Sequence, residues 1–461
     1  MTKPEKTAGA PRRQLSLLDT TCIIVGIIIG SGIYKTTPLI AMNVPGPSAL
    51  LLVWIAGGLI SLVGALCYAE LATAFPREGG DYVYLTKAYG RRAGFVFAWC
   101  EFWIIRPGNV GMMAFVFAEY AKNLIVLNLG GVGQRYDEMV FACAALLVLT
   151  VLNLLGVRSG KWTQNLLTGV KVVGLLAIFA VALFWSPPQP AEASVARPPV
   201  NPDISLSTAM VLVLFTYGGW NDVSFVAAEV HNPRRNLLRA LLLGLGVVTL
   251  IYVLVNLAFL RVLGIEGTAN SSVPAADVLE QTLGEAGSRV MSALICVSAL
   301  GAMNGMMFTG ARIYFALGEE HRLYAWLGRW SARFDAPLRA LSLQFLVTAS
   351  LVILIGRDAD GFTKLLVFSA PVFWAFIFLV AISLFVLRGK RPDTTNVYRV
   401  PLYPLTPIAF CASTAFLVYS SINYSIYYAR EHGSWEYLLT AAIVALGVMM
   451  SLLDPNRGKV V

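Results

Sequence analysis

Twelve apolar segments run through most of this sequence and decide its fold class. Each is close to or above the roughly 20 residues that an α-helix needs to cross about 30 Å of hydrocarbon. Strands of a membrane β-barrel would be shorter and would alternate apolar with polar residues, so we interpret the segments as helices. They cover approximately residues 17–42, 49–75, 93–125, 138–157, 163–185, 206–230, 237–263, 288–318, 337–356, 362–388, 405–429 and 435–454.

Composition supports a chain embedded in a bilayer. Of the 461 residues, 57% are hydrophobic and only 13% are charged, whereas a soluble protein has about 25% charged residues. The first apolar segment has no cleavage pattern of small residues after a short core, so we interpret it as a retained span. The sequence therefore predicts an all-α membrane protein with twelve transmembrane helices and the lipid bilayer as its surroundings.

Cysteine and histidine give no sign of a metal site or of disulfides. All six cysteines fall inside apolar segments, where we expect them to be reduced packing residues. There is no CxxC pair, and the three histidines lie near segment ends. We expect no metal and no cofactor. A membrane enzyme is also disfavoured, because the spans contain no histidine and the chain has no GxSxG motif.

The net charge of +9 is distributed as in a membrane protein rather than a nucleic-acid-binding one. Lys3, Lys6, Arg12 and Arg13 lie in the N-terminal tail, and most other basic loop residues fall in the loops expected on the same side. Basic loops stay on the cytoplasmic side, so we expect both termini in the cytoplasm and the protein in the inner (plasma) membrane. No nucleic-acid partner is expected.

The stretch VGIIIGSGIY, Val25 to Tyr34, places Gly30, Ser31 and Gly32 in the middle of the first apolar segment. Each glycine costs a helix about 1 kcal/mol relative to alanine, which favours a break. A break would leave the N–H groups of residues 31–33 and the carbonyls of residues 27–29 without helical partners. Such a pair of half-helix ends suits a zwitterion, because the N–H end attracts a carboxylate and the carbonyl end attracts an ammonium. The alternative is that small residues here only allow close helix packing.

A second interruption, Gly218-Gly219, lies in segment 206–230 and is followed by Trp220, Asn221 and Asp222. It falls five segments after the first, in a helix that enters from the opposite side. Two interrupted helices in corresponding positions are typical of an inverted five-helix repeat. We therefore expect a cytoplasmic tail (1–16), a first repeat (17–185), a second repeat (206–388), two peripheral spans (405–454) and a C-terminal tail (455–461).

Charged residues inside the spans are further candidates for function. Glu101 and Arg106 lie in segment 93–125, where Pro107 and Gly108 predict a kink. Charges at such depth pair or line an aqueous path, and at a spacing of five these two need not pair with each other. Lys171 stands alone in segment 163–185, where it should contact carbonyls or a carboxylate, or shift its pKa. The alternative is that it extends towards the membrane surface.

Five motifs, taken in order, resemble the amino acid-polyamine-organocation superfamily, and within it the L-type amino acid transporters and their bacterial relatives. The motifs are IIVGIIIGSGIY, FWIIRPGNVG, TGVKVVGLL, LFTYGGWN followed by EVHNPRRN, and ALGAMNGMMFTGARIYF. This resemblance covers roughly spans 1 to 10. It implies ten core helices in two inverted repeats plus two peripheral ones, and sodium-independent exchange of L-amino acids by alternating access. The small gaps left by Gly and Ser at the breaks favour neutral substrates of small to medium size.

The resemblance also implies roles for individual residues. Phe215 would be an aromatic gate, and Lys171 would replace a coupling ion. The substrate would lie against Ile28, Gly30, Ser31, Gly32, Ile33, Phe215, Gly218, Gly219 and Asn221.

Two departures from the family pattern carry expectations of their own. The vertebrate members bond an ancillary glycoprotein through a cysteine after span 3, but Asn123 to Glu138 contains none, so we expect no such subunit. Asp222 stands where the family often has an aromatic or neutral residue. It could face the pocket and favour cationic side chains, or it could pack against a helix. Proton-coupled symport through Glu101 or Glu229, or a ligand-binding sensor, remain alternatives.

Overall fold

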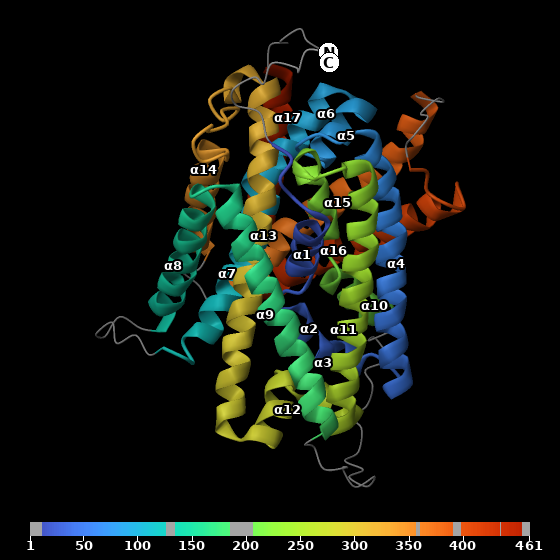
Figure 1. Cartoon of the computed structure of the whole chain (residues 1–461), viewed down its shortest axis with the longest axis vertical. Coiled ribbons are helices and arrows are strands. Elements are labelled where there is room, and N and C mark those ends of the chain that lie inside the picture. Colours follow the sequence, from blue (N-terminus) through green and yellow to red (C-terminus); the bar gives the residue numbers. More distant parts are fainter. Residues whose placement is uncertain are drawn as a thin grey trace.

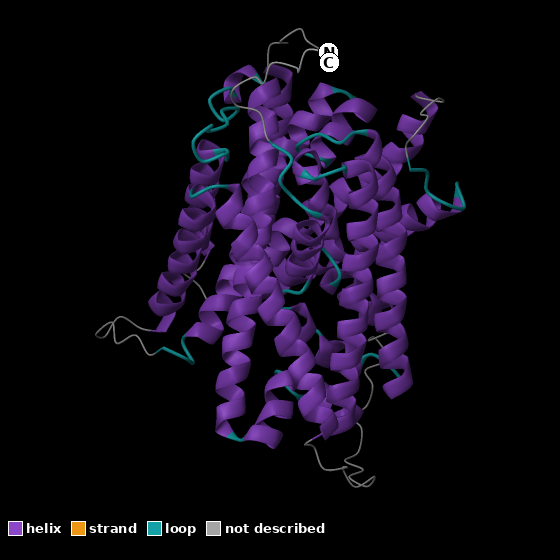
Figure 2. Cartoon of the chain, in the orientation of Figure 1, coloured by secondary structure: helices purple, strands orange, loops and turns teal. Residues whose placement is uncertain are grey.

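The computed structural model describes residues 12–125, 134–184, 206–355, 360–390, 398–433 and 435–453. Within these ranges the chain is an elongated bundle of helices joined by short loops (Figures 1 and 2). No strand is present in the described ranges, and the only β-type contacts there are isolated bridges, Leu15 with Val230 and Ser331 with Ala336. The predicted all-α architecture is confirmed.

Eleven segments of the described chain are long and apolar enough to cross a membrane. Of the twelve predicted segments, only 93–125 is missing from these eleven. It is built from three consecutive helical pieces, α6, η1 and α7. The helices are α1 (Leu17–Ile28), α2 (Gly32–Lys35), α3 (Thr37–Met42), α4 (Pro47–Ala74), α5 (Asp81–Tyr89), α6 (Arg91–Cys100), η1 (Glu101–Ile105), α7 (Arg106–Ala121), α8 (Gln134–Leu154), α9 (Val157–Phe184), α10 (Leu206–Thr216), η2 (Trp220–Glu229), α11 (Pro233–Asn270), α12 (Pro274–Leu283), α13 (Glu285–Glu320), η3 (Arg322–Tyr324), α14 (Leu338–Ile355), α15 (Gly361–Lys390), α16 (Leu405–His432) and α17 (Glu436–Leu453).

Both predicted helix breaks are present. The first helix stops at Ile28, and α2 begins only at Gly32. In the second broken span, α10 stops at Thr216 and η2 begins at Trp220. Gly219, just before η2, has a φ of 103°, a backbone conformation that favours glycine. The sequence did not predict that the second half of this span is a 3₁₀ helix rather than an α-helix.

Glycines let the two broken helices touch. A Cβ on Gly219 would lie 2.5 Å from Cγ2 of Ile27, and one on Gly32 would lie 2.7 Å from Cγ2 of Thr216. The contact is completed by a hydrogen bond of 2.9 Å between the hydroxyls of Thr36 and Thr216. Around this centre, α1 packs against α9, α11 and α13, so the breaks lie inside the bundle (Figure 1).

The irregularity predicted at Pro107-Gly108 lies slightly earlier in the chain. Residues Glu101–Ile105 form a π-helix, and the N–H of Arg106 donates to the carbonyl of Glu101. Pro107 has no N–H to donate to the carbonyl four residues earlier, so the regular α-helical ladder cannot continue through this point. The π-helix therefore changes the register of the helix immediately before the proline.

Candidate substrate site between the helix breaks

A cavity of about 110 Å³ lies between the two helix breaks. Its walls come from both halves of each broken helix and from α7, α13 and α15. The lining residues are Ile27, Ile28, Gly30, Ser31, Gly32, Arg106, Asn109, Met112, Met113, Phe215, Thr216, Gly218, Gly219, Asp222, Ala302, Met306, Ala370, Phe373 and Trp374.

Most of the residues that the sequence assigned to substrate binding line this cavity, and two do not. Ile33 is fully buried outside it, so that only its backbone could contribute to the site. Asn221 lines a smaller neighbouring cavity instead. The residues that do line the main cavity are Ile28, Gly30, Ser31, Gly32, Phe215, Gly218 and Gly219.

The carbonyls at the end of α1 differ from expectation. The sequence predicted that those of residues 27–29 would all lack partners. Instead, the Ile28 carbonyl accepts hydrogen bonds from the N–H of Gly30 at 2.8 Å and from the hydroxyl of Tyr252 at 3.1 Å. The Ile29 carbonyl accepts from the hydroxyl of Ser298 at 3.0 Å. Side chains distant in sequence therefore stabilise the open helix end, and the carbonyls of Ile28 and Ile29 have hydrogen-bond donors within the protein.

Lys171 is fully buried behind the first break rather than in the cavity wall. Its ammonium donates to the carbonyls of Gly26, Ile29 and Ser298 at 2.9, 2.8 and 3.0 Å. The predicted contact with carbonyls is thus confirmed, and the alternative in which Lys171 extends to the membrane surface is wrong. Gly301 makes room for it, because a Cβ there would lie 2.7 Å from the Lys171 Nζ. The Lys171 side chain therefore holds the end of α1 through these hydrogen bonds.

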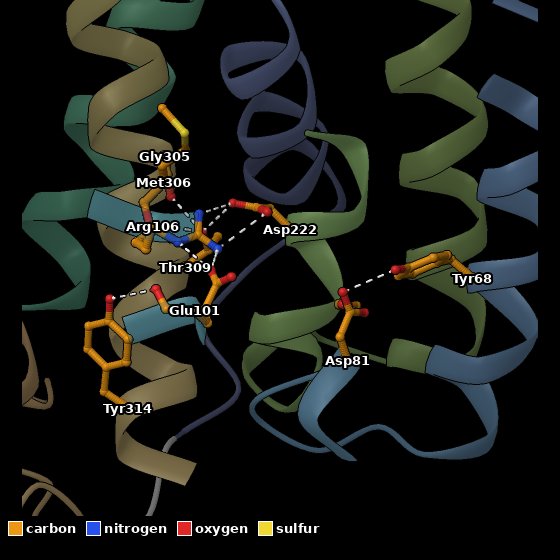
Figure 3. Close-up of polar contacts among 10 residues, drawn as sticks. Tyr68, Asp81, Glu101, Arg106, Asp222, Gly305, Met306, Thr309 and Tyr314 are labelled. Atoms are coloured by element: carbon orange, nitrogen blue, oxygen red, sulfur yellow. Dashed lines mark hydrogen bonds and ion pairs between the residues drawn. The ribbon is translucent and has the colours of Figure 1, made fainter. Parts of the chain in front are cut away.

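A buried ion cluster forms one wall of the cavity (Figure 3). Arg106 Nη1 lies 2.5 Å from Asp222 Oδ2, and Arg106 Nε donates to Glu101 Oε1 at 2.8 Å. The hydroxyl of Thr309 donates to Asp222 Oδ2 at 2.9 Å. Asp222 therefore does both things that the sequence left as alternatives: it lines the cavity and it packs against neighbouring helices as an ion-pair partner.

Five apolar residues of the cavity wall were not among the predicted site residues. Met112 and Met113 come from α7, Met306 from α13, and Phe373 and Trp374 from α15. Two weak signals existed in the sequence: the span containing Met306 is rich in Gly, Ala and Met, and Trp374 lies near the middle of its span. Spacing alone could not show which side of these helices faces the breaks.

Sequence comparisons identify the family of the chain. The sequence matches the amino acid permease family over residues 15–449. The chain belongs to this family. The resemblance to L-type transporters is also confirmed, because mouse large neutral amino acids transporter small subunit 2 is 30% identical over 91% of this chain and 80% of its own length.

Two other permeases align along nearly the whole chain. Mouse b(0,+)-type amino acid transporter 1 is 28% identical over 96% of this chain and 88% of its own length. The serine/threonine exchanger SteT of Bacillus subtilis (strain 168) is 28% identical over 89% of this chain and 91% of its own length. The family match, over residues 15–449, includes both helix breaks and the ion cluster, so the cavity lies within the part of the chain that the family model covers.

Proposed function

We propose that this permease is a sodium-independent, obligatory exchanger of neutral, small to medium L-amino acids. The observation that carries the proposal is the cavity between two broken helices in a chain of this family. Alternating access would move the broken helices, α1 with α2 and α10 with η2, around a midplane site. We place the protein in the inner (plasma) membrane with both termini in the cytoplasm, because its basic loops are unevenly distributed.

The helix ends supply the groups that an amino acid needs. The first N–H groups of a helix have no intrahelical acceptors, so those at Ser31 and Gly32 can donate to a substrate carboxylate. The substrate ammonium would then lie against the carbonyls of Phe215 and Gly218 across the cavity. The Phe215 ring would act as an aromatic gate, since it lies in the cavity wall at the end of α10.

The walls favour substrates with uncharged side chains. Three methionines and the rings of Phe373 and Trp374 make much of the surface apolar and adaptable. Asp222 could attract a cationic side chain, but its carboxylate already pairs with Arg106. The gaps left by Gly30, Ser31 and Gly32 in the wall suit a small to medium side chain. The relatives named for serine/threonine exchange and for large neutral amino acids support this substrate class.

Sodium independence is supported by Lys171. Its ammonium occupies a cage of three carbonyls, the kind of ligand that a sodium ion would require. A second cation close to a fixed ammonium would be repelled strongly in such a dry site. We also propose that the chain works without an ancillary glycoprotein, because no cysteine is present between Asn123 and Glu138. The residues 126–133 of that loop lie outside the described part of the chain.

Counterflow in proteoliposomes tests the proposal. Vesicles loaded with unlabelled alanine should take up labelled alanine, serine and leucine equally well with and without sodium, and labelled arginine poorly. Empty vesicles should take up little, because exchange needs a counter-substrate. Failure of every amino acid to exchange would refute the proposal. Uptake into empty vesicles driven by a pH gradient would instead support a proton symporter.

A further inference from the structure

The ion pair between Arg106 and Asp222 separates two cavities. One is the substrate cavity; the other, of about 10 Å³, is also lined by Asp81, the first residue of α5, and by Phe97 of α6. Four residues line both: Arg106, Asn109, Asp222 and Phe373. The pair is therefore part of a partition between the substrate cavity and the end of the bundle where α5 and α6 lie (Figure 1).

The partition joins three separate elements. Asp222 comes from η2, Arg106 from α7, and Thr309, which also bonds Asp222, from α13. The side chains of Arg106 and Asp222 are 2% and 6% exposed. If η2 moves to open a path towards α5, this contact must break. Separating a buried ion pair is costly chiefly because it leaves a charge without a partner.

Glu101 gives Arg106 a second partner that would not move with η2. In a regular α-helix, residues five apart lie on different faces, because each residue turns about 100°. The π-helix at Glu101–Ile105 brings Arg106 directly above Glu101, and the side chains meet at 2.8 Å (Figure 3). The Arg106 stem packs over Gly310, where a Cβ would lie 2.7 Å from Nε, so the guanidinium is also held from α13.

We propose that Glu101 is a positioning residue that keeps Arg106 paired while Asp222 leaves with η2, so that the partition can open without an unpaired buried guanidinium. The inference rests on the proposed exchange function and deepens it. In the closed arrangement Arg106 holds both carboxylates. In the open arrangement Arg106 stays with Glu101 on its own helix, and Asp222 faces water that enters from the α5 end.

Variants of the two carboxylates test this in the counterflow assay with purified, reconstituted full-length protein. Glu101→Gln should lower the exchange rate about tenfold or more, because opening now leaves Arg106 unpaired. Substrate binding, followed by the fluorescence of Trp374 and the other tryptophans, should change little. Glu101→Asp, which keeps the carboxylate, should restore part of the rate. Glu138→Gln, which removes a surface ion pair with Lys122, is the matched control.

The double variant Glu101→Gln/Asp222→Asn gives the decisive comparison. Arg106 is then unpaired in both arrangements, so the extra cost of opening disappears, and exchange should be faster than in Glu101→Gln alone. If Glu101 only stabilises the fold, the double variant should exchange more slowly than Glu101→Gln alone. If the double variant does not fold, the comparison of Glu101→Asp with Glu101→Gln decides, and equal rates overturn the inference.

The same assay separates this inference from the proposed function. Loss of exchange in the wild-type chain would overturn the exchanger itself, and the inference with it. Normal wild-type exchange together with an unimpaired Glu101→Gln variant would overturn only the role of Glu101.

Discussion

At the scale of single residues, the site depends on a few buried polar side chains. They donate hydrogen bonds to backbone carbonyls that the helix break leaves without helical partners. Lys171, Ser298 and Tyr252 donate to carbonyls at the end of α1, and each comes from a different helix. An unpaired backbone carbonyl in an apolar interior costs free energy. These donors therefore stabilise the helix break, which the local sequence allows but does not stabilise by itself.

Replacing Lys171 by alanine should abolish or strongly slow exchange. The carbonyls of Gly26, Ile29 and Ser298 would lose the Lys171 donor, and that of Ile29 would keep only the Ser298 hydroxyl, so the end of α1 would be held less firmly. Counterflow of labelled substrate measures the effect. Lys122→Ala, at a surface ion pair, is the control and should exchange normally. Unchanged kinetics in Lys171→Ala would show that this ammonium only fills space.

Glu78, in the turn between α4 and α5, should make stability depend on pH. Burial, with a smaller contribution from Glu229 and Glu319, raises the pKa of Glu78 to about 7. The folded protein then favours the protonated carboxyl, so stability should be highest below the ordinary pKa of 4.5 and should fall as pH rises towards 7.

Thermal unfolding of the wild-type chain and of Glu78→Gln at several pH values measures this effect. The glutamine variant lacks the titrating group, so its advantage over the wild type should grow between pH 5 and 8. Glu431→Gln, at an exposed position of α16, should show no such trend. A constant difference between Glu78→Gln and the wild type across this range would contradict the prediction.

At the scale of helices, much could be predicted from sequence because the signals are local. Apolar length predicted the spans, and Gly30 and Gly218 with their neighbours predicted the breaks. The 3₁₀ helix η2 and the π-helix η1 could not be predicted, since they differ from an α-helix by one residue of hydrogen-bond register and depend on neighbouring helices. The pairing of Arg106 with Asp222 joins residues 116 positions apart, which spacing cannot show.

Gly219→Ala should impair both folding and exchange, because this position needs a positive φ and lies against Ile27. The loss of thermal stability should be on the order of 1–3 kcal/mol, the range for a strained backbone position. Gly246→Ala is the matched control, because a Cβ there meets nothing within 4 Å. Equal melting temperatures and exchange rates in the two variants would contradict a strained break at Gly219.

At the scale of the whole molecule, the helices place a small cavity between two broken spans and close one side of it with buried ion pairs. Besides Arg106 with Asp222, Arg312 pairs with Glu229 at 2.6 Å, linking α13 to the end of η2. The backbone of Leu15 bonds to Glu229 and His231, so the segment before α1 is also fixed there. These contacts join the segment before α1 to the end of η2. In the proposed exchange cycle, opening on the α5 side would separate them.

The most direct test of the central claim is a structure of the protein in a lipid nanodisc with a bound neutral amino acid that it exchanges. The substrate carboxylate should lie within hydrogen-bond distance of the N–H groups of Ser31 and Gly32, with its ammonium towards the carbonyls at Phe215 and Gly218. A bound amino acid elsewhere, or continuous helices through residues 30–32 or 218–219, would contradict the claim that paired helix breaks form the substrate site.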